Sequence, residues 1–236
     1  MRNLLVAIAF LTCIKANAQM EISVGTGVGW YRMSDFKKFQ EDIKVAIPVD
    51  AQITEEFPPY ITYEGSLIWH MYRSGFLGLY YQFGSTAGRI YYEDYSGKTY
   101  TDMMFRYNTL TLSAGEEMAF ENNFFLRIDL HPGVTFTNLE VLSISRIANQ
   151  GGRDFIKFHS VNAVLQPTVE IHKMWGNFGI KATVGYHFGV YEGKMKLNEN
   201  KDAYLTSGND KITAEWNGLR LGISGRYVFP RATKEK

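Results

Sequence analysis

The chain has little cysteine and no long apolar run after its first residues, and each absence excludes a class of protein. Its single cysteine, Cys13, lies near the start, so the rest has no disulfide framework and no thiol chemistry. No stretch of 18 or more apolar residues follows, which excludes a transmembrane helix. Neither sign of charge is in clear excess, because the net charge is only +1. The charge therefore gives no reason to expect a nucleic-acid partner.

The start of the chain has the composition of a cleavable signal peptide. A positive charge precedes an apolar core over 4–14, and Ala16-Asn17-Ala18 is a small-residue cleavage motif. Cys13 also allows a lipoprotein interpretation, but the residue before it is poor for that processing, so we favour ordinary cleavage. We expect a signal peptide over 1–18 and one exported domain over 19–236.

What the chain does contain is alternation with period two. Along 219–229 one parity is apolar, while the other carries arginine, glycine and serine. Successive side chains of a strand point to opposite faces, so this segment has an apolar and a polar face. Further segments repeat the pattern, and we expect strands at about 20–31, 60–71, 76–90, 105–120, 126–137, 155–172, 178–191 and 219–229.

Long and short connections alternate between these strands. Tight turns fall at 72–75, 121–123 and 174–177, and the longer connections at 32–59, between 90 and 105, at 138–154 and at 192–215. This arrangement predicts an all-β fold, an eight-stranded antiparallel transmembrane β-barrel with up-and-down meander topology. Both ends of the barrel then lie on the short-turn side, which is periplasmic in bacterial barrels.

Three local features carry narrower expectations. The first long connection has room for a short helix within 35–47 before its prolines. Glu116 falls on the apolar parity, which predicts a β-bulge near Gly115-Glu116-Glu117. Pro167 has no amide donor and predicts a local break in the ladder of its strand. Aromatic residues near the strand ends are expected to be membrane-interface anchors; at the loop end they include Trp30, Tyr107, Phe136, Phe188 and Trp216.

The inward parity carries charges of both signs. An eight-stranded barrel is just wide enough for its side chains to fill, and an enclosed charge without a partner costs several kcal/mol. We therefore favour a structural salt-bridge network over an ion path, and we expect Glu21 and Arg226 to pair where the first strand meets the last. The inward charges are Glu21, Glu64, Arg127, Asp129, Glu170, Lys181, Arg220 and Arg226.

Two residue pairs have the chemistry of barrel enzymes. Asp129 and His131 share the inward face, like the Asp-x-His pair of omptin proteases, but those enzymes need ten strands and further aspartates, so structural pairing is favoured. His159 and Ser160 are adjacent and must point to opposite faces, unlike the pair of barrel lipid A deacylases. We expect no catalytic residue, no metal ligand and no cofactor.

The hairpin Glu121-Asn122-Asn123-Phe124-Phe125-Leu126-Arg127 and the closing segment 219–229 carry a family resemblance. Together with the leader and the strand plan, they make the chain similar to small outer-membrane β-barrel proteins of Bacteroidetes, the OmpA/OmpX-like domains. The resemblance covers the mature chain and implies an outer-membrane barrel, often without known activity. Phe229 resembles the terminal aromatic that the barrel assembly machinery reads, although Pro230 to Lys236 follow it.

The leading functional hypothesis is a non-enzymatic barrel whose long extracellular loops make surface contacts, as in adhesion, or serve envelope assembly. The alternative is a barrel that handles lipid or a small hydrophobic ligand, by transport or by lipid modification at the rim. A soluble barrel of lipocalin type is disfavoured, because lipocalins hide their apolar side inside. Expected partners are outer-membrane lipid, the barrel assembly machinery and an envelope protein, with no nucleic acid.

Overall fold

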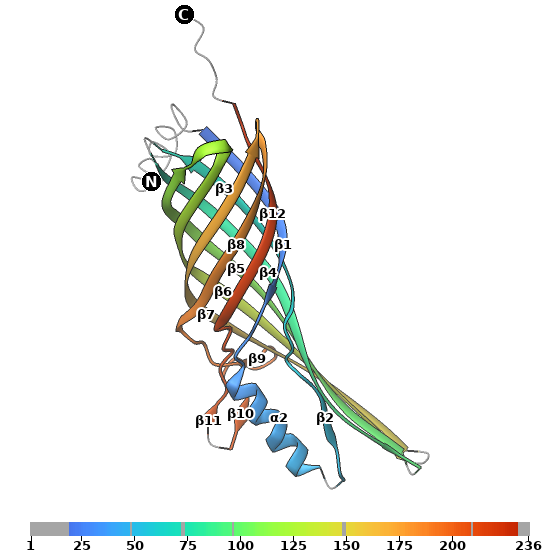
Figure 1. The fold of residues 1–236 in the computed structure, drawn as a ribbon. Helices are drawn as coiled ribbons and strands as arrows, with labels where there is room; N and C mark the ends of the chain where they lie inside the picture. Colours follow the sequence, from blue (N-terminus) through green and yellow to red (C-terminus); the bar gives the residue numbers. More distant parts are fainter. Residues whose placement is uncertain are drawn as a thin grey trace, which may run out of the picture.

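A computed structural model describes residues 19–230 apart from 48, 72–73, 96, 148–149 and 209. The expected signal peptide lies outside these residues. Eight strands form a closed antiparallel ring, because the first strand of the chain pairs with both the second and the last strand of the ring (Figure 1). In ring order they are β1 (Gln19–Gly29), β3 (Tyr60–His70), β4 (Gly75–Asp94), β5 (Gly97–Ala119), β6 (Phe124–Ile147), β7 (Gln150–Trp175), β8 (Phe178–Tyr191) and β12 (Gly218–Val228). The predicted eight-stranded up-and-down barrel is confirmed.

The remaining elements lie in the connections. The first long connection contains helix α2 (Ser34–Ala46), as expected, and strand β2 (Gln52–Glu56), which pairs with β4. The last contains β9 (Lys196–Leu197), β10 (Thr206–Ser207) and β11 (Asp210–Lys211), and a short 3-10 turn spans Glu121–Asn123. Among the described residues, no helix is long and apolar enough to cross a membrane.

The two faces of each strand follow the alternation of the sequence. In β8, Ile180 and Val184 are half exposed on the outside, whereas Lys181 and Thr183 are buried in the lumen. The other strands of the ring have the same arrangement, with apolar side chains on the outside and polar side chains in the lumen, the reverse of a soluble protein. Closure gives each ring strand a partner on both sides, which pairs most of its backbone groups as a hydrocarbon environment demands. The fold is therefore that of a transmembrane β-barrel.

The short-turn end brings the chain termini of the barrel together. The amide of Phe229 donates to the carbonyl of Met20 over 2.8 Å, so β1 begins where β12 ends. The turn between β7 and β8 contains Gly176 at φ 62°, a left-handed conformation that glycine adopts at little cost. The longer connections gather at the opposite end, which we call the loop end (Figure 1).

The register of the strands corrects one local prediction and supports another. The β4–β5 pairs run without a shift from Gly75–Glu116 onward, so the bulge predicted near Gly115-Glu116-Glu117 is wrong. Glu116 instead lies exposed on the outer face at the short-turn end of β5, where the strand is leaving the apolar band. At Pro167 the β7–β8 pairs are interrupted, as expected for a residue without an amide donor.

The second and third long connections are not loops. β4 to β7 continue past the barrel as a four-stranded ribbon over 88–94, 97–103, 141–147 and 150–156, with β2 along its edge (Figure 1). The expectation of irregular loops there is wrong, because the strand pairing continues through polar residues and through Gly151 and Gly152. This ribbon projects well beyond the rim of the barrel.

Candidate functional site in the lumen and at the loop end

The short-turn half of the lumen contains a cluster of ionisable side chains. Three acids, three bases and two histidines lie there, and ion pairs between neighbours link them into one connected set. We call it the charge cluster; its members are Glu21, His70, Glu117, Arg127, Glu170, His172, Lys181 and Arg226. Opposite charges in equal number offset part of the cost of enclosing each ion.

Arg127 on β6 is the centre of this cluster. Its side chain is fully buried, and its Nη2 lies 2.9 Å from Glu21 Oε2 and 2.6 Å from Glu117 Oε2. Its Nη1 lies 3.4 Å from Glu170, whose other oxygen lies 2.7 Å from Lys181 Nζ. One guanidinium therefore links carboxylates from β1, β5 and β7 across the lumen, which closes it at this level.

Arg226 on β12 makes the contact expected across the barrel seam. Its Nη2 lies 2.5 Å from Glu21 Oε2, so the predicted pairing of these two residues is confirmed. In the register, Glu21 is opposite Val228 and Arg226 is opposite Ser23, so the pair is diagonal across the seam. The guanidinium also reaches Glu117 and the Nδ1 of His172.

The ligand types of a metal site are present in the cluster. One donor atom each from Glu21, His70 and Glu117 can be chosen so that all lie within 4.8 Å of one another. Both carboxylates, however, already contact the guanidinium groups of Arg127 and Arg226. A divalent cation would have to approach two fixed positive charges, so this donor set favours ion pairing over metal binding.

The eight inward charges predicted from the sequence do not form one network. Glu21, Arg127, Glu170, Lys181 and Arg226 come together in the charge cluster, and three others lie nearer the loop end. Those three are Glu64, Asp129 and Arg220, each buried with different partners.

Glu64 and Asp129 are held by neutral or histidine partners in the middle of the lumen. The hydroxyl of Tyr80 donates to Glu64 over 2.7 Å, and Ser224 donates to its other oxygen. Asp129 Oδ2 and His131 Nε2 lie 2.8 Å apart, both buried. The Tyr80 ring lies 4.7 Å from that of His131, so the two acid sites are joined through this tyrosine.

Three members of the charge cluster are not among the eight inward charges that the sequence predicts. Glu117, His70 and His172 all have inward parity on their strands, so strict alternation would have found them. The bulge expected near Gly115-Glu116-Glu117 would shift the parity of β5, so the sequence does not predict Glu117 in the lumen. His159 and Ser160 point to opposite faces, as expected, since Ser160 is buried while His159 reaches Asn198 outside over 2.7 Å.

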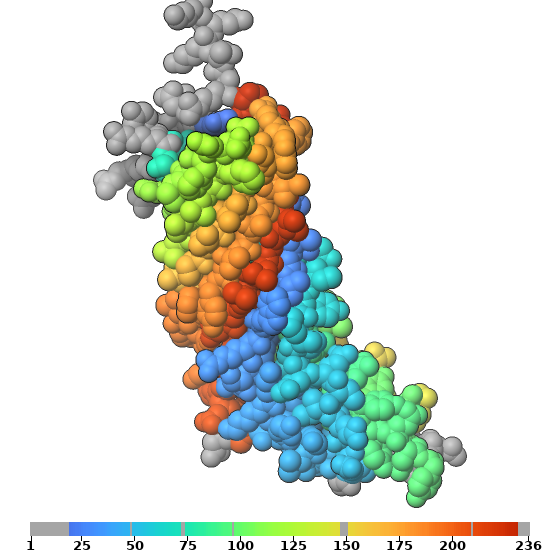
Figure 2. All heavy atoms as spheres, in the orientation of Figure 1, coloured from blue at the N-terminus to red at the C-terminus, as the bar shows by residue number. Residues whose placement is uncertain are grey.

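The loop end of the barrel is closed by an apolar core of its own. Side chains from α2, β5, β6 and the last long connection pack together over the loop end of the lumen. We call this the loop-end core; its fully buried large members include Met33, Phe36, Met103, Phe105, Tyr107, Leu139 and Trp216. Figure 2 shows one side of the outer surface that covers this core, which continues from the barrel without a gap.

Trp216 lies at the centre of the loop-end core. Its ring centroid is 4.4 Å from that of Tyr107 and 4.9 Å from that of Tyr31, and its Nε1 donates to Thr137 over 2.7 Å. Arg220 donates to the carbonyl of Trp216 over 2.8 Å. The expectation that Tyr107 and Trp216 are membrane anchors is therefore wrong, because both are buried in protein.

The outer surface of the ribbon is the most exposed part of the loop end. Tyr95 near its tip is fully exposed, and ion pairs cross the strands below it. Arg89 lies 2.5 Å from Asp102, and Lys157 lies 3.1 Å from Glu140. Exposed tyrosine and arginine are enriched in contact surfaces between proteins, whereas lysine and the acids are depleted there.

Neither a protein-family model nor a curated protein matches the sequence. Among solved structures, the chain is similar to Ail, the attachment invasion locus protein of Yersinia pestis, at 11% identity over 90% of this chain and 99% of Ail, with a TM-score of 0.40. It is also similar to Neisserial surface protein A, at 10% identity over 90% and 99%, with a TM-score of 0.43. The N-terminal β-barrel domain of Pseudomonas aeruginosa OprF matches at 14% identity over 90% and 100%, with a TM-score of 0.34. Likeness at this level says nothing about what the chain binds.

Proposed function

We propose that the protein is a non-enzymatic barrel of the bacterial outer membrane that presents a rigid loop-end surface for contact with another molecule. The partner class is a protein or glycan outside the cell or in the envelope. An origin in Bacteroidetes and a role for the barrel assembly machinery stay predictions from the resemblance.

The observation that carries this proposal is the loop-end core. Loops that only connect strands do not need fifteen buried apolar residues drawn from the long connections and from the strands β4 to β7. Here α2 is anchored at its start, because Asp35 accepts hydrogen bonds from the amide and hydroxyl of Thr213 over 3.0 and 2.9 Å. A preorganised surface loses less entropy on binding, which favours affinity.

The filled lumen supports the same proposal by weighing against transport through the barrel. A solute would have to displace the charge cluster at one end and the loop-end core at the other. Breaking buried ion pairs costs several kcal/mol, and the wall leaves little room for side chains to move aside. Function then rests with the outer surfaces.

The location is tested by fractionation of cells that express the full chain. We expect the protein with outer membranes and a shift in gel mobility after heating, because closed barrels resist unfolding until heated. Recovery in the soluble periplasm would contradict the proposed location.

The contact role is tested by display on cells that otherwise lack adhesins. We expect cells with the wild-type chain to bind at least one surface in a panel of matrix proteins, glycans and bacterial cells. We expect the contact to be made by the ribbon part of the loop-end surface, so the variant Tyr95→Ser/Tyr100→Ser should lower binding. Val45→Ser, exposed on α2 outside the ribbon, is the control and should bind as the wild type does. Equal binding by wild-type and empty cells throughout the panel would refute the proposed role.

A further inference from the structure

A pocket lies in the wall of the barrel at the loop end of β7, lined by outward residues and by the buried Ser160 and Asn162. It has a volume of about 610 Å³ and is formed between β7 and the segment that follows β8. The pairing of β7 with β8 ends at Ala163–Tyr191, and pairing with β9 begins at His159. Residues 160–162 therefore have no strand partner on this side, and the pocket occupies that interruption.

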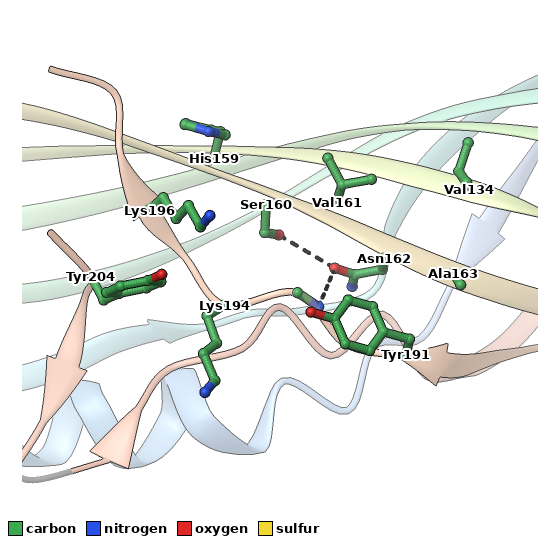
Figure 3. A pocket seen from close by; sticks show the side chains of 11 residues that line it. Val134, His159, Ser160, Val161, Asn162, Ala163, Tyr191, Lys194, Lys196 and Tyr204 are labelled. Carbon is green, nitrogen blue, oxygen red and sulfur yellow. Dashed lines mark hydrogen bonds between the residues drawn. The ribbon is translucent and has the colours of Figure 1, made fainter. Parts of the chain in front are cut away.

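The pocket has an apolar end and a cationic end (Figure 3). Val134 and Ala163 lie at one end, on the outer face of β6 and β7, while His159, Lys196 and Tyr204 gather at the other. Three of the lining residues can carry positive charge, namely His159, Lys194 and Lys196, and none is acidic. Neither lysine has an ion-pair partner among the described residues, and the Lys196 ammonium lies 5.6 Å from the centre of the Tyr204 ring.

The lining of the pocket changes from apolar to cationic side chains at the loop-end edge of the lipid-facing band. Phe136 and Val161 are paired across the strands and about half exposed on the outer face. Two positions further along, the outward pair is Asn138 and His159, and the surface becomes polar. This is the depth at which lipid headgroups meet a membrane protein.

Strand pairing fixes the backbone of both lysines, while in Figure 3 their side chains extend in different directions, that of Lys196 toward Ser160 and that of Lys194 away from it. Lys194 pairs with Thr213 and Lys196 with Tyr204 in β-bridges. The buried side chain of Asn162 fixes the start of the segment, because its Oδ1 accepts from the amide of Gly193 over 3.0 Å and its Nδ2 donates to Ala214 over 2.6 Å. The cationic end is thus part of the folded wall.

We propose that this pocket binds an anionic phosphorylated lipid of the outer leaflet, with the phosphate at Lys194 and Lys196 and an acyl chain along Val134, Val161 and Ala163. Charge complementarity selects the phosphate, and the apolar floor selects a chain attached to it. Free phosphate would gain only the first of these contacts. This inference concerns the wall of the barrel and does not depend on the contact role of the loop end.

Native mass spectrometry of the full chain in detergent tests the proposal. The probes are dioleoyl phosphatidic acid and dioleoyl phosphatidylcholine, which share their acyl chains and differ in headgroup charge. We expect the wild-type protein to prefer the phosphatidic acid, and the variant Lys194→Gln/Lys196→Gln to bind it about 30-fold more weakly, which corresponds to about 2 kcal/mol.

Matched variants separate a site from general charge. Lys38→Gln/Lys201→Gln removes the same charge from exposed loop-end positions and should keep wild-type binding, as should Lys194→Arg/Lys196→Arg. Equal loss in the Lys38/Lys201 variant, or equal binding of both lipids by the wild type, would overturn the proposal. Complete competition by inorganic phosphate would also overturn it, because the site would then recognise free phosphate without a lipid chain.

Discussion

Glu21 on the first strand and Arg226 on the last lie 2.5 Å apart, on the diagonal across the seam that closes the barrel. Both side chains are enclosed, and Arg226 cannot shed its charge. The contact joins the two ends of the barrel by an ion pair in addition to the backbone ladder.

Removing one partner of this pair should destabilise the barrel. Arg226→Leu leaves three acids against two bases in the charge cluster, and we expect it to lower the free energy of unfolding by about 3 kcal/mol. Glu21→Leu/Arg226→Leu restores the balance and should recover part of the loss. Urea unfolding in lipid vesicles, followed by gel mobility, measures both. A double variant no more stable than Arg226→Leu would contradict this account of the seam.

The loop-end core should open when Trp216 is truncated. Trp216→Ala removes the ring that packs on Tyr31 and Tyr107, and we expect a local loss of about 3–5 kcal/mol. Hydrogen exchange over 192–217 should accelerate while the barrel strands stay protected. Trp30→Ala is the control, because that ring is 40% exposed on the outside. Equal acceleration in both variants would show that Trp216 does not hold the core together.

The segment after β8 should be less stable at neutral than at acidic pH because of Glu192. Burial raises the pKa of this carboxyl above its usual value, and the nearby Glu215 raises it further. The folded state then binds the proton more tightly than the unfolded state. Stability from this group is present below the usual carboxyl pKa and is lost as pH rises through the raised value.

Glu192→Gln tests this pH dependence. The amide oxygen can still accept from Asn217, and the amide nitrogen can donate to the hydroxyl oxygen of Thr213, without the charge. The variant should therefore slow hydrogen exchange over 192–217 at pH 7 and change little at pH 4. Faster exchange in the variant at pH 7 would mean that the carboxylate stabilises the segment.

How far the sequence predicts this structure depends on the range of the interactions. Strand parity is local, and it placed Arg127, Lys181 and Arg226 in the lumen correctly. The ribbon was missed because polar side chains and Gly151-Gly152 are typical of loops, and only pairing between four strands keeps them extended. Trp216 was assigned to the membrane because its burial depends on contacts from Tyr31 and Tyr107, which alternation does not reveal.

We propose that the filled lumen of the described barrel offers no path to solutes, so that the protein acts by its outer surfaces. Conductance of the purified full chain in planar lipid bilayers tests this most directly. The charge cluster and the loop-end core predict no steady current of porin size at any holding potential. Large, steady, voltage-independent channels from the wild-type protein would contradict the claim.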